Sequence, residues 1–265
     1  MVMKIERLHN KDEIEAFLRK NVGLHIYSIG DLDDFFWRNT QWHALRKNDE
    51  IQTIALMYCR PSLVTLQALS EQVNPMRELL RHTLHKLPER FHAHLSPGVE
   101  GAFKERYETE SCEKHYKMVL NSKRFPTRID CSRVTRLTEN DLDQMLQLYE
   151  QAYPDNWFDS RMLQTGQYFG IEIENKLVSA AGIHVYSKRY RVAALGNIVT
   201  HPDYRGRGFA KSVTARLCRS LSENVEHIGL NVRANNTMAI ALYETLGFEI
   251  TDPYYECMIS ASDVI

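Results

Sequence analysis

The chain has 265 residues, of which 43% are hydrophobic and 25% charged, as is ordinary for a folded protein of one or two domains. Its 33 Lys and Arg residues nearly balance 34 Asp and Glu residues, and the net charge of -1 argues against nucleic-acid binding. No apolar run approaches the roughly 18 residues of a membrane span, and residues 1–7 lack a signal-peptide core. The five cysteines form no CxxC pair. We therefore expect a cytoplasmic protein with free thiols, without a membrane partner.

The first half of the chain alternates between strand and helix patterns. The predicted strands are 4–8, 41–46, 51–58, 63–69, 90–95 and 115–120. The predicted helices are 10–20, a second one within 22–36, 75–87 and 98–108. The stretch 121–130, which contains Pro126 and several charges, is the predicted domain boundary.

The second half follows a similar order with clearer signals. Its predicted strands are 133–137, 168–173, 177–186, 192–200, 228–232 and 254–259. Its predicted helices start at Thr138, which has the side chain of an N-cap, at 159, after Gly208 and at 236. The repeated order predicts α/β domains at 1–125 and 131–265, and one larger mixed domain is the alternative.

The most informative segment is the loop that follows the strand at 192–200. After His201-Pro202 it reads Arg205-Gly206-Arg207-Gly208, and a helix follows. Helix N-termini offer free N–H groups to phosphates, and glycine lets the backbone approach an anion closely. The loop lacks the third Gly or Ala of a dinucleotide fingerprint and the G-x-x-x-x-G-K-[ST] of a P-loop. We predict an anion-binding loop suited to a pyrophosphate.

The pattern R-x-x-G-x-A, Arg205 through Ala210, resembles motif A of the GNAT superfamily of acyl-CoA-dependent N-acyltransferases. A second block, Leu230 to Phe248, looks like motif B of the same family. The wording G-N-I-V-T-H-P-x-Y-R-G-R-G is most similar to the glycine N-acyltransferase-like branch. The corresponding place in the first half, 69–75, reads L-S-E-Q-V-N-P and has no glycine. The resemblance therefore implies tandem GNAT-like domains, each a mixed, mostly antiparallel sheet flanked by helices, with a degenerate N-terminal copy.

The resemblance also implies the residues that bind acetyl-CoA. The backbone at 198–201 would pair with the pantetheine and the acyl carbonyl, and N–H groups of the loop would hold the pyrophosphate. Asn236 would bond the cofactor arm or serve as a plain N-cap, and the basic side chains would reach phosphates or stay solvated. The implied set is Ile198, Val199, His201, Arg205, Gly206, Arg207, Gly208, Phe209, Ala210, Lys211 and Asn236.

The implied reaction is direct attack of a neutral amine on the thioester of acetyl-CoA. Tyr243 matches the family's tyrosine acid, which would protonate the departing thiolate, and packing on the helix face is its alternative role. The strand at 192–200 holds no carboxylate to act as a general base. The candidate bases are His184, His201, Glu172 and Glu174, or a water chain, and an amine that arrives already neutral would need no base.

We therefore expect an N-acetyltransferase whose acceptor is a small amine or an amino acid. A protein or peptide acceptor, and a non-catalytic acyl-CoA sensor, are the alternatives. A monomer and a homodimer both fit the sequence. No metal is expected: His92 and His94 share one strand face, but the chain contains neither H-E-x-x-H nor C-x-x-C.

Overall fold

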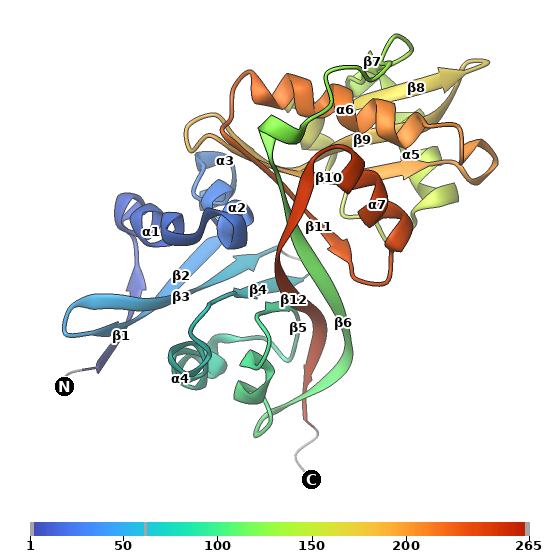
Figure 1. Ribbon diagram of the computed structural model, residues 1–265. Helices are drawn as coiled ribbons and strands as arrows, with labels where there is room; N and C mark the ends of the chain where they lie inside the picture. The colour runs from blue at the N-terminus through green and yellow to red at the C-terminus, as the bar shows by residue number, and fades with distance from the viewer. Residues whose placement is uncertain (1–2, 61–62, 263–265) are drawn as a thin grey trace. The chain divides into compact units, whose positions relative to one another are not determined.

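The computed structural model describes residues 3–60 and 63–262, which belong to two compact units (Figure 1). Unit 1 contains the chain up to Lys117, the segment Val232–Asn236 and the segment from Ile250 onward. Unit 2 contains Met118–Asn231 and Thr237–Glu249. Three strands have residues in both units: β6 (Tyr107–Leu120), β11 (His227–Arg233) and β12 (Phe248–Ala261). Among the described residues, no helix is both long and apolar enough to cross a membrane.

Unit 1 is a mixed sheet with helices against it. Its other elements are β1 (Met3–Leu8), α1 (Lys11–Leu18), η1 (Arg19–Asn21), α2 (Val22–Gly30), α3 (Asp34–Trp37), β2 (Thr40–Lys47), β3 (Glu50–Cys59), β4 (Val64–Ala68), α4 (Val73–Thr83), η2 (Leu84–Lys86), β5 (Arg90–Leu95) and η3 (Val99–Ala102). The strands follow the order β1-β2-β3-β4-β5-β12-β6. β4 and β5 are parallel, whereas β1–β2, β2–β3, β3–β4 and β5–β12 are antiparallel. The last strand of the chain thus completes the sheet of the first unit.

The alternation of side chains along β5 separates an apolar face from a polar one. Phe91, Ala93 and Leu95 are fully buried and lie in one apolar cluster with residues of α4. Successive side chains of a strand point to opposite faces, so His92 and His94 lie on the face away from this cluster. One face of β5 therefore packs in the apolar core, and the other face carries the two histidines.

The strands of unit 2 also pair in a mixed parallel and antiparallel pattern. Its elements, besides the strands named above, are η4 (Ser122–Arg124), β7 (Thr135–Arg136), η5 (Glu139–Asp141), α5 (Leu142–Ala152), η6 (Ser160–Thr165), β8 (Phe169–Ile173), β9 (Lys176–Ser187), β10 (Val192–Thr200), η7 (Pro202–Tyr204), α6 (Phe209–Ser222) and α7 (Thr237–Thr245). The strand order is β11-β10-β9-β8-β7, with β10 and β11 parallel and the other pairs antiparallel. Helix α6 packs on β8, β9 and β10 (Figure 1).

Both units share one sequence of elements. Each has an antiparallel hairpin, β2–β3 or β8–β9, followed by a strand, a helix and a parallel strand. These last three are β4, α4 and β5 in unit 1, and β10, α6 and β11 in unit 2. The predicted class, mixed α/β with mostly antiparallel sheets flanked by helices, is confirmed.

The predicted helix at 98–108 is wrong. Only the single turn η3 forms there, and β6 begins at Tyr107. Gly98 has a φ of +92°, in the left-handed region that a helix interior does not use. The Tyr107 hydroxyl donates a hydrogen bond to the Leu84 carbonyl at 3.2 Å, which fixes the start of the strand.

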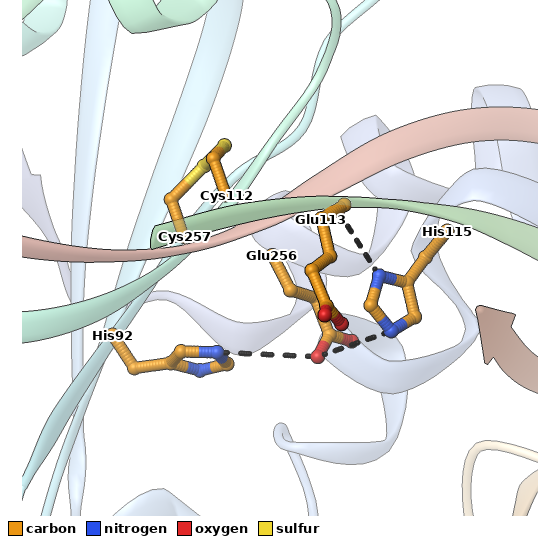
Figure 2. Close-up of a disulfide and its surroundings, with 6 residues drawn as sticks. All are labelled: His92, Cys112, Glu113, His115, Glu256 and Cys257. Carbon is orange, nitrogen blue, oxygen red and sulfur yellow. Dashed lines mark hydrogen bonds and ion pairs between the residues drawn. A yellow bond between two sulfur atoms is a disulfide. The ribbon is translucent and has the colours of Figure 1, made fainter. Parts of the chain in front are cut away.

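The expectation of free thiols is wrong for two of the five cysteines. Cys112 on β6 and Cys257 on β12 form a disulfide, with their Cα atoms 4.0 Å apart (Figure 2). The two residues are 145 positions apart, and only the neighbouring placement of β6 and β12 brings them together. Cys59, Cys131 and Cys218 are free.

Candidate active site

Strand β10 runs past the end of its pairing with β11. The parallel register begins with Val192 opposite His227 and ends with Leu195 opposite Leu230. β10 then continues to Thr200, still paired on its other side with β9. The parallel pairing with β11 therefore does not extend to the backbone groups of β10 that follow Leu195. An extended ligand can pair with backbone groups in such a position.

A bulge bends β10 at this point. Asn197 has a φ of +53° and is buried, and the register with β9 shifts between Gly196 and Val199. The Asn197 amide donates to the Tyr168 hydroxyl at 3.1 Å, and the Tyr149 hydroxyl donates to the Asn197 carbonyl at 3.2 Å. Bulges re-aim a strand next to functional sites. Neither tyrosine was predicted from the sequence, although asparagine's tolerance of positive φ is a usable signal for such a bulge.

Two glycines shape the loop between β10 and α6. Gly206 and Gly208 have φ values of +77° and +80°, and a Cβ atom at either would meet nothing within 4 Å. Gly208 is the N-cap of α6 and has no side chain to accept hydrogen bonds from the first N–H groups of the helix. Those donors and the positive end of the helix dipole therefore face open space, an arrangement that binds phosphates.

Backbone carbonyls hold the arginines of this loop. Arg205 Nε donates to the Thr200 carbonyl at 3.2 Å, and Arg207 Nη2 donates to the Asp203 carbonyl at 3.2 Å. Both arginines are exposed, and Lys211 is half-buried in the first turn of α6. The structure thus brings together the glycines and cations that the sequence predicted for anion binding.

The two histidines proposed as bases differ in their surroundings. His201 Nδ1 accepts a hydrogen bond from the Asp203 backbone N–H at 3.3 Å, so the lone pair of its neutral ring is already used. His184 lies on β9 against β10, and a Cβ at Gly196 would come within 2.3 Å of its Nε2. Of the two, His184 has the better position beside the bent part of β10. Glu172 and Glu174 are exposed, and Glu174 lies in the β8–β9 turn.

Tyr243 lies on α7 and is 8% exposed. Its ring makes an edge contact with Phe248, with centroids 5.9 Å apart. Burial raises the pKa of Tyr243, and the neighbouring Tyr153 and Cys218 raise it further. The phenol is therefore protonated at neutral pH, as a proton donor must be. Asn236 directly precedes α7, and its backbone N–H donates to the Arg233 carbonyl at 3.0 Å.

The equivalent loop of unit 1, residues 69–72, is organised differently. The Ser70 N–H donates to Ser96 Oγ at 2.9 Å, and the Gln72 N–H donates to Ser70 Oγ at 3.0 Å. Glu71 accepts a hydrogen bond from the Asn21 amide at 2.6 Å. Donors that would face a phosphate are thus used within the protein, beside a carboxylate that repels one.

The fold and the loop of unit 2 are similar to those of a class, the acyl-CoA-dependent transferases of the GNAT type. Residues 134–248, which are less than half of the chain, match the family model described as "Acetyltransferase (GNAT) family". The match covers the segment from the strand before α5 to the start of β12.

Proteins similar to this chain agree with that class. The [ribosomal protein bS18]-alanine N-acetyltransferase of Salmonella typhimurium is 29% identical over 140 residues, which are 50% of this chain and 93% of the relative. The chain spans about half the length or less of other bacterial relatives. The match covers 52% of the length of one of them and 37% of the length of another.

Two solved structures share the fold over nearly the full chain. An X-ray structure of a Drosophila protein has a TM-score of 0.73 at 13% identity, covering 97% of this chain and 98% of that one. A tandem GNAT protein from the clavulanic acid biosynthesis pathway has a TM-score of 0.59 at 12% identity, with 98% of both chains covered.

Proposed function

We propose that this protein transfers the acetyl group of acetyl-CoA to a primary amine, and that unit 2 binds the cofactor. One observation carries the proposal. The N-terminus of α6 follows two glycines in the left-handed conformation, which leave open space for a pyrophosphate. This loop comes after β10, a strand that continues beyond its parallel pairing with β11. The motif wording supports placement in the glycine N-acyltransferase-like branch, and the repeated element order supports a degenerate copy at 1–125 followed by an active copy at 131–265.

The cofactor would lie along β10 with its phosphates at the loop. The backbone of Ile198 and Val199 would pair with the pantetheine, and N–H groups from Arg205 to Ala210 would bind the pyrophosphate. The His201 N–H donates to the Val178 carbonyl at 2.8 Å, and the His201 carbonyl accepts from the Tyr204 N–H at 2.9 Å. His201 would therefore offer the cofactor the second lone pair of its carbonyl oxygen. Arg207 and Lys211 would add charge at the phosphates.

Within this proposal, His184 accepts a proton from the attacking amine. The amine nitrogen forms a bond to the thioester carbonyl carbon, and the carbon–sulfur bond then breaks. Tyr243 donates its proton to the departing sulfur and regains one from solvent, which leaves an amide and free coenzyme A. Each proton therefore has a named donor or acceptor among the residues of unit 2.

The acceptor we favour is a small amine or amino acid. A peptide N-terminus is a second candidate, because the Salmonella typhimurium relative is named for acetylating an alanine of a ribosomal protein. Thiol release from acetyl-CoA should be measured with glycine and other amino acids, small amines, and peptides that begin with alanine. Release that depends on a single class identifies the acceptor. Calorimetric binding of acetyl-CoA without release on any acceptor would favour a sensor, and absence of binding would refute the proposal.

A further inference from the structure

A group of titratable side chains lies in unit 1, apart from the proposed transferase site. His92 and His94 alternate with the buried apolar residues of β5 and so share its opposite face. Glu256 lies directly opposite His94 in the antiparallel register of β5 and β12. His115 lies on β6, on the other side of β12. Three adjacent strands thus direct three imidazoles at one carboxylate.

The distances within this group are longer than those of hydrogen bonds. His94 Nε2 lies 3.6 Å from Glu256 Oε1, while His92 Nε2 and His115 Nε2 lie 3.9 Å and 3.6 Å from Oε2. Figure 2 shows His92 and His115 approaching the carboxylate from two sides. An N–H···O bond is normally about 2.7–3.2 Å long. Two ligand atoms of a tetrahedral zinc ion are about 3.4 Å apart, since each lies about 2.0–2.1 Å from the metal.

The hydrogen bond at the far side of His115 supports a cation between the groups. His115 Nδ1 lies 3.1 Å from the Glu113 carbonyl oxygen, which can only accept, so Nδ1 carries the proton. The other ring nitrogen, Nε2, then faces the Glu256 carboxylate and can present a lone pair to a cation between the two groups. Metal-binding histidines commonly have this second hydrogen bond to a carbonyl.

We propose that His92, His94 and Glu256 bind a divalent transition-metal ion of the Zn²⁺ class, with His115 as the fourth protein group beside the carboxylate. One ligand atom from each of the first three residues lies within 4.8 Å of the others. Imidazole and carboxylate are ligands that suit zinc. This site goes beyond the proposed transferase function, and neither depends on the other.

The accessibility of the group and the hydrogen bond of its carboxylate fit a metal. The side chains of His92, His94 and Glu256 are 13%, 14% and 23% exposed, which leaves a path for an ion. The Tyr254 hydroxyl donates to Glu256 Oε1 and orients the carboxylate.

An anion is a poorer occupant than a cation. The carboxylate of Glu256 is the group that all three histidines approach, so an anion would have to sit against a negative charge. The nearby cation of Lys117 lies over the ring of Tyr254, 4.7 Å from its centroid. This contact places the ammonium against a ring face, which is itself an attractive site for it.

The test is zinc binding by the full chain. Protein stripped with a chelator is titrated with ZnCl₂ in competition with a chromophoric chelator, and we expect one zinc ion per chain. His94→Gln and Glu256→Gln should each weaken binding by about 100-fold or more, and His115→Gln by about 10- to 100-fold. His82→Gln is the matched control, because His82 is 56% exposed on α4 and its polar contacts among the described residues are with Glu78, one helix turn away.

Two further measurements keep the proposal falsifiable if a variant fails to fold. Circular dichroism of each metal-free variant shows whether it is folded, and Co²⁺ substituted into the native protein reports the ligands directly. A tetrahedral Co²⁺ spectrum without a thiolate charge-transfer band supports the histidine and carboxylate set. Failure of the native protein to bind stoichiometric zinc, equal zinc affinity in folded Glu256→Gln and His82→Gln, or a thiolate band would overturn the proposal.

Discussion

Replacement of Gly208 by valine tests whether the loop before α6 holds the cofactor. Gly208 has a φ of +80°, and a Cβ there would meet no protein atom within 4 Å. The substitution therefore causes backbone strain but no collision. Holding valine in the left-handed conformation should lower the free energy of unfolding by about 1–2 kcal/mol. That cost is small compared with the free energy of unfolding of a typical domain, which is about 5–15 kcal/mol, so the fold should persist.

The effect on cofactor binding should be much larger. The new side chain would project into the space that we assign to the pyrophosphate and would cost at least one hydrogen bond to a charged group. Such a bond contributes about 1.5–3 kcal/mol, which corresponds to an affinity lower by about 10- to 150-fold. Isothermal titration calorimetry with acetyl-CoA measures the affinity, and urea denaturation measures the stability.

The matched control is Gly98→Val in unit 1. Gly98 also has a positive φ, +92°, and a Cβ there would contact the Val73 side chain at 3.3 Å. This variant should lose at least as much stability as Gly208→Val and keep its affinity for acetyl-CoA. An affinity of Gly208→Val within about threefold of the native value, with the fold intact, would remove the loop from the cofactor site, because a lost bond of this kind costs more.

Three other predictions address separate features. Tyr243→Phe should lower kcat by about 100-fold and leave the acetyl-CoA Kd unchanged, and steady-state kinetics with an undiminished kcat would reduce Tyr243 to a packing residue. Burial raises the pKa of Asp31 from 3.8 to about 7, against opposing effects of the Gln67 hydrogen bond and Arg60. The folded state therefore takes up a proton between these values and loses stability as pH rises through them. Asp31→Asn should raise Tm at pH 8 and change it little near pH 4, and calorimetry showing equal shifts at both would contradict this. Thiol titration of the denatured, unreduced chain should give three thiols, rising to five after reduction, and five at the outset would exclude the disulfide of Cys112 and Cys257.

Features set by neighbouring residues could be predicted from the sequence. The bounds of β5 and β10 agree with the predicted strands 90–95 and 192–200. Thr138 caps its helix as expected: its hydroxyl accepts from the Asn140 N–H, and Asp141 bonds back to its backbone. Period, capping and glycine spacing are local, and they reveal an element before its tertiary partners are known.

Features set by strand pairing could not be predicted. His92 and His94 were visible as a pair on one strand face, but Glu256 joins them only because β12 pairs with β5. The same placement explains the disulfide, whose cysteines lie 145 residues apart. The helix predicted at 98–108 failed because its apolar residues serve instead to anchor a turn and the start of β6. Local patterns carry no information about which distant strand lies alongside.

The position of β12 has a consequence for synthesis on the ribosome. The sheet of unit 1 needs β12 between β5 and β6, yet the part of β12 that pairs with β5 is translated after every residue of unit 2. Domains generally fold in the order in which they emerge, at about 5–20 residues per second during translation. Here the strands that emerge first must wait for the last one, with the edge of β5 unpaired for the time needed to make residues 96–250. During that interval the edge of β5 that later pairs with β12 is without its partner strand, and unpaired strand edges are sites of aggregation.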